Sequence, residues 1–552
     1  MIRTLLVIFV MMLGLNKTLA QTPASPFLHT ERQVITPENV MQLVPAAEIG
    51  KGLLIDALWL ENGALAVITT RGVYLYPAGD LTATPDLIAY EPNPFAARYA
   101  SFEAARISMA GDVIVILTMD GSLAVDTATG QIVPPPDDAE TVDGEATPEI
   151  VTGTRRVVLE TNEETNRVDI VVRDSAGGDE LARIPNVACT LRRNGASLLY
   201  HQADETLYVV SKPGLGGTIR AWDFSGESPE LIGEVLDFRN SINDVTFSPD
   251  GSTLYMAQGS QNPICNGSAT GDSVAQYDMM TGQLTGYLPL DGDYMPHAVA
   301  INSDGDMLVG GLRVVAYRPG DAEGFTVAPV ESPFNTSTVI ADDGTPYAYV
   351  NGSIVQLNAS GAVEQVFAED LRSDIRIPGW GRGIAVTDDL LIYMGLDNTV
   401  LIRDRATNTL RQTLTFDRQV NGIVYDAASG LLGVHTGNGR LEGTLNTVEF
   451  FRIASQGEGV EPVGTADIHT ANRSLNLSPG GALLATTHTA GDASLGSLDI
   501  GPSLVHFYDT ATGERLGGFS DFYVQYPVRF SPDGTYLVIS GGGGNLLVYA
   551  LP

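Results

Sequence analysis

The chain has 552 residues, with 66 acidic and 31 basic side chains and a formal net charge of −35. This balance argues against nucleic acid and anionic lipid as partners, because both are bound by clustered lysine and arginine. A hydrophobic fraction of 44% is typical of a globular protein, and the 60 glycines and 30 prolines require a fold rich in turns.

The first twenty residues predict an export signal. Arg3 gives a basic start, residues 4–15 are apolar, and small residues end at Ala20. The apolar run is too short for the ~30 Å hydrocarbon core of a membrane. We therefore expect cleavage after Ala20, a secreted, periplasmic or cell-envelope location, and no membrane insertion afterwards. Residues 21–35 are expected to form a linker.

From residue 36 onwards the sequence repeats itself. The pattern Phe-Ser-Pro-Asp-Gly at Phe247–Gly251 recurs at Phe530–Gly534, with looser copies at Leu477–Gly481 and Ile301–Gly305. A turn glycine or its equivalent falls near residues 63, 111, 153, 195, 251, 305, 344, 388, 430, 481 and 534. These positions define eleven units, spaced by about 40–50 residues as in propeller repeats.

Each unit shows the same order of short strands. An apolar strand leads into an Asp-Gly turn, a second strand follows, and a loop of variable length leads to a third strand. The third strand ends in an Asp-x-x-Thr-Gly turn, as at Asp278–Gly282, before a fourth strand closes the unit. Four antiparallel strands per unit predict a propeller blade. We interpret the turn aspartates as structural, because aspartate bonds its own backbone in such turns.

Several short motifs resemble known propeller repeats. Trp222-Asp223 ends a third strand, Tyr277-Asp278 replaces that pair elsewhere, and Pro296–Ala300 precedes Asp304-Gly305. On these residues, the chain from 36 to 552 resembles bacterial WD-repeat and quinoprotein-like (YVTN/lactonase-like) propeller proteins. The resemblance implies an all-β fold of about eleven four-stranded blades, in two packed propellers or in one oversized ring. It does not imply one function, because this fold hosts many.

The expected domain organisation divides the blades into two groups. The first covers residues 36–371 with about seven blades, and the second covers 372–552 with about four. The stretch 372–383, with Pro378 and Gly379, is the predicted crossing. The last unit ends as a third strand, so residues 41–49 are expected to complete its sheet and to join the two ends of the chain. In that case the two groups would be nested.

Long loops are the first candidates for function. In such propellers the loops between second and third strands lie on one face together with the connections between blades, and that face usually binds partners. Four such loops are long: Ser211–Gly217, Gly259–Asp272, Thr436–Asn446 and Ala490–Ser503. They supply the candidate binding residues Lys212, Asn262, Asn266, Asp272, His435, Asn438, Arg440, His488 and Asp492. Neutral variation of surface loops is the alternative explanation.

The two cysteines and two histidines complete the candidate residues. Cys189 aligns with an early position of a first strand and Cys265 lies in the long loop of the next unit, so an exported chain is expected to join them in a disulfide. Two unrelated thiols are the alternative. His297 and His469 precede first strands and are candidate ligands at a channel mouth. No histidine or cysteine pair has zinc-type spacing, so no cofactor or metal is expected.

Three functions remain open. The first is a secreted, non-enzymatic scaffold that binds a protein, peptide or glycan through the long loops. The second is a lactonase-like or quinoprotein-like enzyme with a ligand or metal at the channel mouth near His297. The third is a structural component of the cell envelope.

Overall fold

The structure is a computed structural model of the chain. It describes residues 32–89, 106–118, 121–136, 149–162, 167–189, 196–211, 217–226, 228–238, 242–258, 273–288, 290, 296–311, 313–317, 325–329, 337–350, 353–358, 363–368, 383–437, 446–454, 459–468, 472–489, 503–519, 524–541 and 545–552.

The described residues form eleven four-stranded antiparallel sheets and two short 3-10 helices, which confirms the predicted all-β fold of propeller blades. Ten sheets are built from four strands that are consecutive in the sequence. The eleventh combines strands from the two ends of the chain.

Four blades, here called the four-blade unit, come first. They are β2 (Leu54–Trp59), β3 (Leu65–Thr69), β4 (Gly72–Tyr76) and β5 (Asp86–Ala89); β6 (Arg106–Ala110), β7 (Val113–Thr118), β8 (Gly121–Asp126) and β9 (Gln131–Val133); β10 (Glu149–Thr152), β11 (Arg155–Asn162), β12 (Arg167–Asp174) and β13 (Glu180–Cys189); and β14 (Ala196–His201), β15 (Thr206–Ser211), β16 (Gly217–Asp223) and β17 (Glu230–Phe238). The helix η2 (Pro77–Gly79) follows β4.

Seven further blades, here called the seven-blade ring, make up the rest. They are β18 (Ile242–Phe247), β19 (Thr253–Gln258), β20 (Ser273–Asp278) and β21 (Leu284–Leu288); β22 (Ala298–Ile301), β23 (Met307–Gly310), β24 (Arg313–Tyr317) and β25 (Phe325–Pro329); β26 (Ser337–Ile340), β27 (Pro346–Val350), β28 (Ser353–Leu357) and β29 (Val363–Ala368); β30 (Ile384–Val386), β31 (Leu390–Met394), β32 (Thr399–Asp404) and β33 (Leu410–Thr415); β34 (Val420–Asp426), β35 (Leu431–Thr436), β36 (Asn446–Ile453) and β37 (Val460–Ile468); β38 (Asn472–Leu477), β39 (Leu483–Thr489), β40 (Ser503–Asp509) and β41 (Arg515–Phe519); and β42 (Val524–Phe530), β43 (Tyr536–Gly541) and β44 (Leu546–Ala550) with β1 (Val44–Ile49).

The last blade of the ring joins the two ends of the chain. Strand β1 pairs antiparallel with β44, from Val44 opposite Ala550 to Ile49 opposite Leu546. The preceding residues also lie against this blade: the backbone N–H of Ile35 donates to the carbonyl of Gly534 at 2.9 Å, and the helix η1 (Val40–Gln42) follows. The pairing covers a sheet edge that would otherwise be open.

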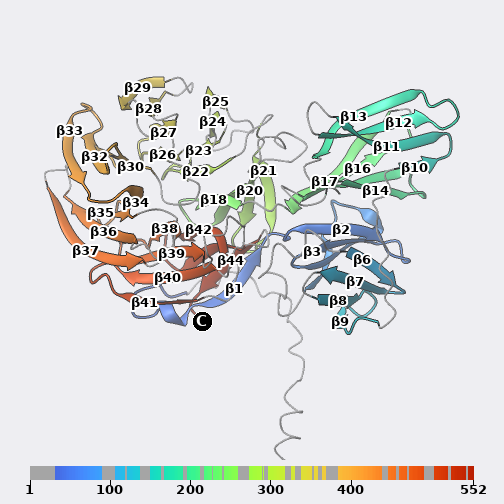
Figure 1. Cartoon of the computed structure of the whole chain (residues 1–552), viewed down its shortest axis with the longest axis horizontal. Coiled ribbons are helices and arrows are strands. Elements are labelled where there is room, and N and C mark those ends of the chain that lie inside the picture. Colours follow the sequence, from blue (N-terminus) through green and yellow to red (C-terminus); the bar gives the residue numbers. More distant parts are fainter. Residues whose placement is uncertain are drawn as a thin grey trace, which may run out of the picture.

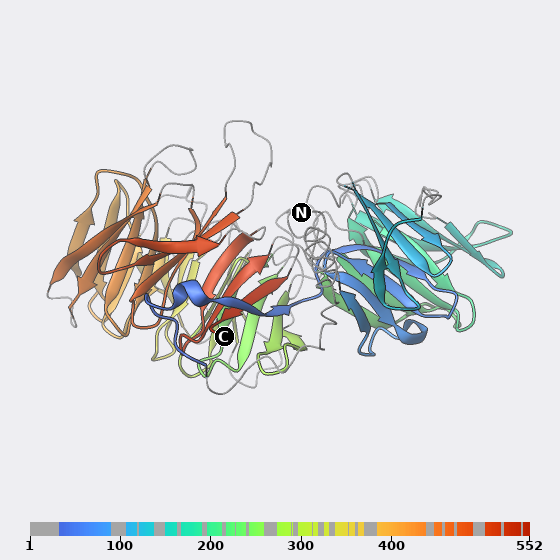
Figure 2. The ribbon, with the colours of Figure 1, turned by 90° about the horizontal axis from the view of Figure 1, so that it is seen from below.

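The seven inner strands contact one another in cyclic order. Strand β18 contacts β22, and the series continues through β26, β30, β34, β38 and β42 back to β18. Figure 1 shows these blades arranged around a centre in one lobe, while β2–β17 form a second lobe beside it. The view from below in Figure 2 shows the same two lobes, with β1 in blue lying along the red strands of the last blade.

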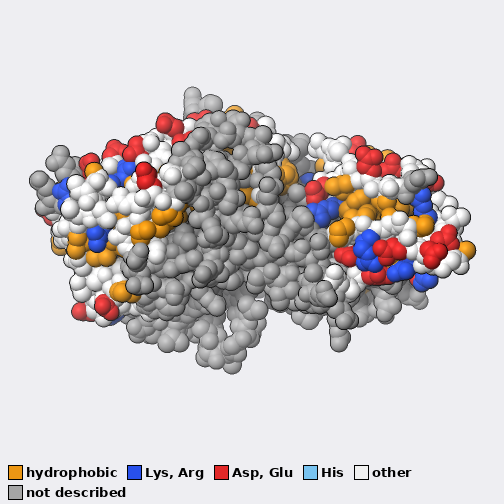
Figure 3. Space-filling view, turned by 90° about the horizontal axis from the view of Figure 1, so that it is seen from above, with side chains coloured by type: hydrophobic (Ala, Val, Ile, Leu, Met, Phe, Trp, Pro, Cys, Tyr) orange, Lys and Arg blue, Asp and Glu red, His pale blue; other side chains and the backbone are white. Residues whose placement is uncertain are grey.

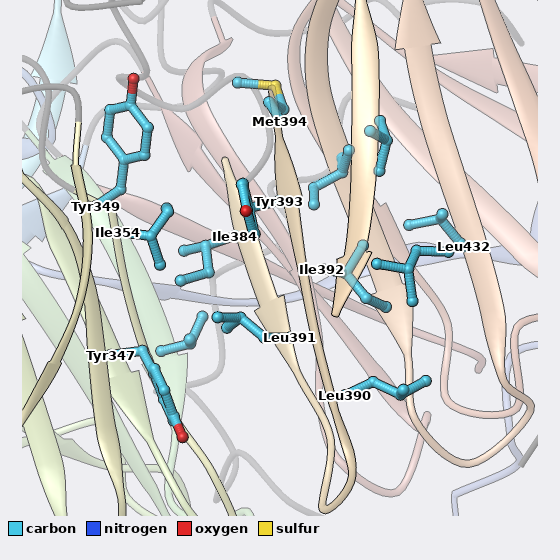
Figure 4. Close-up of a cluster of buried hydrophobic side chains, with 14 of the residues drawn as sticks. Tyr347, Tyr349, Ile354, Ile384, Leu390, Leu391, Ile392, Tyr393, Met394 and Leu432 are labelled. Carbon is cyan, nitrogen blue, oxygen red and sulfur yellow. The ribbon is translucent and has the colours of Figure 1, made fainter. Parts of the chain in front are cut away.

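The division between the two groups therefore differs from the predicted one. The chain leaves the four-blade unit between Phe238 and Ile242, and residues 371–382 lie outside the described residues. The blades on either side of that stretch share one hydrophobic core, in which Tyr347 of β27 and Ile384 of β30 are both buried. Figure 4 shows neighbouring side chains of β31 reaching opposite sides, Leu391 towards Tyr347 and Ile392 towards Leu432. This stretch consequently connects two adjacent blades of the same ring.

The four-blade unit packs in a different way. Its first blade shares a core with β14–β17 and another with β6–β9, and β10–β13 shares a core with β14–β17. In the part of the chain that the structure describes, no hydrophobic cluster joins β6–β9 to β10–β13.

The blade β10–β13 has one apolar and one charged face. Val157 of β11 packs against β14–β17, and its neighbours Arg156 and Glu160 lie on the opposite face because side chains alternate along a strand. That face carries the ion pairs Glu149–Arg156, Glu160–Arg173, Glu160–Arg183, Asp169–Arg183 and Glu180–Arg183. Figure 3 shows acidic and basic side chains gathered next to each other on this lobe. Val171 lies on the same face and is fully buried, but no hydrophobic cluster of the described residues includes it.

The turns have the local chemistry that the repeat predicts. In the turn after β18, one carboxylate oxygen of Asp250 accepts hydrogen bonds from the hydroxyl of Ser248 at 2.6 Å and from the N–H of Ser252 at 3.0 Å. The bond from the Ser248 hydroxyl is the main reason why the pKa of Asp250 is lowered to about 2. Asp278 accepts from the N–H of Thr281 in the same manner at the end of β20. These aspartates are structural.

Candidate functional site

A cavity of about 580 Å³ lies at the centre of the seven-blade ring. All seven inner strands contribute to its wall, largely through their last residues and the turns that follow, for example Ile301–Ser303, Tyr425–Ala428 and Phe530–Pro532. The cavity therefore opens at the end of the ring where these turns lie, here called the turn face. A volume of this size lies within the range of about 300–1,000 Å³ that small-molecule sites occupy.

The one cationic side chain among the described residues of this wall is already paired. The guanidinium of Arg529, in β42, donates to the Asp244 carboxylate at 2.7 Å. The second oxygen of Asp244 accepts from the N–H of Val299 at 3.1 Å, so one buried carboxylate links three consecutive blades. This ion pair closes the ring between its first and last blades.

Two side-chain amides in the ring are also used for structure. The side-chain oxygen of Asn476 accepts from the N–H of Phe530 at 2.8 Å and thereby holds two inner strands together. The side-chain oxygen of Asn302 accepts from the N–H groups of Asp304 and Asp306 at 3.1 and 2.8 Å, which fixes the turn after β22.

A second cavity of about 650 Å³, here called the side cavity, adjoins the central one. Both are lined by Ile340, Asp342, Val386, Tyr425, Ala427 and Ala428. The side cavity adds the exposed carboxylates of Asp388 and Asp389, and no cationic side chain is among its described lining residues. Together the two cavities run from the centre of the turn face outwards over the blade β30–β33.

A buried arginine fixes the two turns that carry these acids. The Arg405 guanidinium donates to the carbonyls of Thr387 and Asp388 at 2.7 and 2.8 Å, and to the Asp343 carboxylate at 2.7 Å. Its Nε donates to the hydroxyl of Tyr347 at 3.0 Å. These bonds tie the turn after β30 to the neighbouring blade β26–β29.

The predicted histidines lie at the opposite end of the ring. His297 precedes β22, and His435 lies near the end of β35; their exposed fractions are 6% and 1%. Burial lowers the pKa of each imidazole to about 4, so both are neutral near pH 7. The His297 side chain is therefore enclosed, and its role as a ligand at a channel mouth stays a prediction. His469 lies outside the described residues.

The predicted long loops do connect second to third strands. The connections are residues 212–216 in the four-blade unit, and 259–272, 438–445 and 490–502 in the ring. The three in the ring leave from the end opposite to the turn face, here called the insertion face. These connections lie outside the described residues, and they hold Lys212, Asn262, Asn266, Asp272, Asn438, Arg440 and Asp492. His488 lies in β39, opposite Asn472 of β38.

The position predicted for Cys189 was wrong. Cys189 ends β13, the fourth strand of its blade, where it lies opposite Arg167, and the next first strand begins at Ala196. The repeat was misread here because Gly195 precedes that strand instead of following it. Cys265 lies outside the described residues, so the disulfide stays a prediction.

The sequence-based interpretation missed the acids of the turn face. Asp342, Asp388 and Asp389 were grouped with structural turn residues, but Asp343 makes the turn bond to the N–H of Thr345, and Thr387 accepts from the N–H groups of Asp389 and Leu390. The signal was available as a doubled aspartate in each turn, where the turn needs at most one.

Two further features are absent from the described residues. No group of three or more His, Cys, Asp or Glu side chains in these ranges could hold a metal ion. Within the same residues, no helix has the length and apolar character needed to cross a bilayer.

No family model and no curated protein matches the sequence. Among solved structures, the chain is similar to the β-propeller domain of Cps50 (Swd1) from Myceliophteria thermophila, with a TM-score of 0.43 and 12% sequence identity. That similarity covers 56% of this chain and 96% of the other one.

Proposed function

We propose that this chain is an exported, non-enzymatic scaffold that holds a protein, peptide or glycan partner on its seven-blade ring. The observation that carries the proposal is the central cavity, whose wall is built by all seven blades and which opens on the turn face. Binding sites of propellers need only such a concave surface on a rigid frame, without a reactive group.

The insertion face offers a second surface for the same function. Three long connections leave the ring at that end, after Gln258, Gly437 and Thr489. Side chains at these strand ends are buried although polar, as Gln258, Thr436 and Thr487 show. Loops anchored on a rigid frame are a common location of binding residues.

Panning a random-peptide display library and a glycan array on the immobilised chain 21–552 tests the proposal. Two variants locate any binder: residues 259–272 replaced by Gly-Ser-Gly, and Ala385→Phe, which narrows the central cavity. Replacement of residues 212–216 in the four-blade unit is the matched control. We expect one of the first two variants to abolish binding while circular dichroism stays unchanged. Binders that survive both variants, or no enrichment at all, would contradict the proposal.

Export is tested separately. Expressed in a bacterium with its own N-terminus, the chain should appear outside the cytoplasm with Gln21 as its first residue, as determined by N-terminal sequencing. An intact N-terminus on cytoplasmic protein would contradict this part of the proposal.

A further inference from the structure

The side cavity and the adjoining part of the central cavity combine an apolar floor with an acidic rim. Ile340, Val386 and the Ala427–Ala428 pair supply apolar surface, and Asp342, Asp388 and Asp389 are exposed at the edge. This arrangement fits a side chain with an aliphatic stem and a cationic end, because lysine and arginine bury the stem while the charged group stays at the surface.

The rim carboxylates are not used by the fold. Arg405 pairs with Asp343, and the turn bonds of this region come from Asp343 and Thr387. In the ranges that the structure describes, no cationic side chain lies against the carboxylates of Asp342, Asp388 and Asp389. A negative field therefore remains at one edge of a preformed cavity, where it attracts a cation.

Tyr425 adds a second means of holding a cation. It lines both cavities, as Asp342 of the acidic rim does, and it is partly exposed. The face of a tyrosine ring attracts an ammonium or guanidinium group that lies within about 6 Å of its centroid.

We infer that this surface binds a peptide segment of a partner protein through a lysine or arginine side chain, which lies on Tyr425 and the apolar floor and faces the acidic rim. The occupant is a segment rather than a small cation, because two joined cavities of about 580 and 650 Å³ give room for several residues. The inference rests on the proposed function and names its partner class and its site.

The test measures affinity for blocked pentapeptides that carry arginine, lysine or glutamine at the centre, flanked by alanine and glycine. Isothermal titration with the full mature chain at low salt should give at least tenfold tighter binding for the arginine and lysine peptides than for the glutamine peptide. The affinity should fall as NaCl is raised, since the rim is exposed and its charges are screened.

The decisive variant is D342N/D388N/D389N, which removes the rim charge and leaves the turn bonds of Asp343 and Thr387 in place. It should lower the affinity for the arginine peptide at least tenfold. The matched control E61Q/D112N/D179N removes the same charge from exposed turns of the four-blade unit and should leave the affinity within twofold. Equal losses in both variants would show a non-specific charge effect and would overturn the inference.

Further outcomes of the same experiments would also contradict the inference. Equal affinity for the arginine and glutamine peptides would show that the site does not recognise a cationic side chain. If butylguanidinium binds as tightly as the arginine peptide, the occupant is a small cation and not a peptide segment. If the chain binds a panned partner through residues 259–272 and none of the pentapeptides, the inference fails while the proposed function stands. If the chain binds neither a panned partner nor any of the pentapeptides, both the inference and the proposed function fail.

Discussion

The two groups of blades are built from the same repeat, but their blades pack against one another in different ways. In the ring, the inner strands contact one another in cyclic order, β1 completes the last sheet, and the Arg529–Asp244 pair links the first and last blades. In the four-blade unit, one face of β10–β13 carries a network of ion pairs. Each ring blade shares a hydrophobic cluster with both of its neighbours, whereas no cluster of the described residues joins β6–β9 to β10–β13.

The largest difference in stability effect between the two groups of blades is expected at β1, the strand that completes the last sheet of the ring. Ile49 ends β1 and is 1% exposed in the core that joins the last blade to β18–β21, so Ile49→Ala should lower the free energy of unfolding by about 2–5 kcal/mol. Val151→Ala on β10, where the side chain is 63% exposed, should change it by less than about 0.5 kcal/mol. Urea denaturation followed by circular dichroism measures both. Equal effects would mean that β1 does not stabilise the ring.

The second difference concerns how the stability of the fold changes at acidic pH. Burial lowers the pKa of His435 to about 4, whereas an unfolded histidine titrates near 6.5. Below pH 6.5 the unfolded chain therefore binds a proton that the folded chain does not. Stability should fall by up to about 3 kcal/mol as the pH drops from 6.5 to 4, and it should not change for this reason above 6.5.

His435→Leu should remove part of that slope in urea denaturation at pH 4.5, 5.5 and 6.5. His201→Leu is the control in the four-blade unit, where the imidazole is partly exposed and lies 2.7 Å from Asp204. It should leave the slope in place. A slope that is the same in both variants would show that the buried imidazole does not govern the acid response.

The third difference concerns ion pairs. The Asp244 and Arg529 side chains are 9% and 15% exposed, so Asp244→Asn leaves an arginine largely buried without its counter-charge and should cost about 2 kcal/mol. Glu149→Gln breaks a pair whose side chains are 36% and 49% exposed, and it should cost less than about 1 kcal/mol. A double-mutant cycle with Arg529→Met gives the coupling energy. A coupling near zero would exclude this pair as the closure of the ring.

The smallest difference is expected at turn glycines. Gly481 and Gly111 both have positive φ, which disfavours alanine by about 1–2 kcal/mol. In the ring, a Cβ on Gly481 would lie 2.5 Å from the hydroxyl oxygen of Ser429 in the neighbouring blade, whereas one on Gly111 meets no described atom within 4 Å. Gly481→Ala should therefore cost about 1 kcal/mol more than Gly111→Ala. Equal costs would mean that turns of adjacent ring blades are not in firm contact.

The sequence predicted the blades well because their turns are local. Asp250 and Gly251 shape one turn with groups only a few residues away, so each copy of the pattern marks its own sheet. The completion of the last sheet by β1 was also within reach, since a unit that ends as a third strand lacks one partner. The misread turn at Gly195 shows how a single glycine outside a strand shifts the whole assignment.

The order of the blades and the acidic rim could not be predicted from the sequence, for two different reasons. Interfaces between blades use the same kinds of side chain everywhere, as Ile392 and Ile423 of adjacent ring blades do, so no local pattern separates a ring from a four-blade unit. The rim joins Asp342 to Asp388, which come from two blades, and only the packing through Arg405 brings their turns together. The doubled aspartates were the one local hint.

The most direct test of the central claim is hydrogen–deuterium exchange of the full mature chain with and without the arginine pentapeptide. We predict slower exchange in residues 341–345, 386–391 and 425–430 of the turn face, and no change in the four-blade unit. Slower exchange confined to the strand ends beside the insertion face, or to β2–β17, would contradict it.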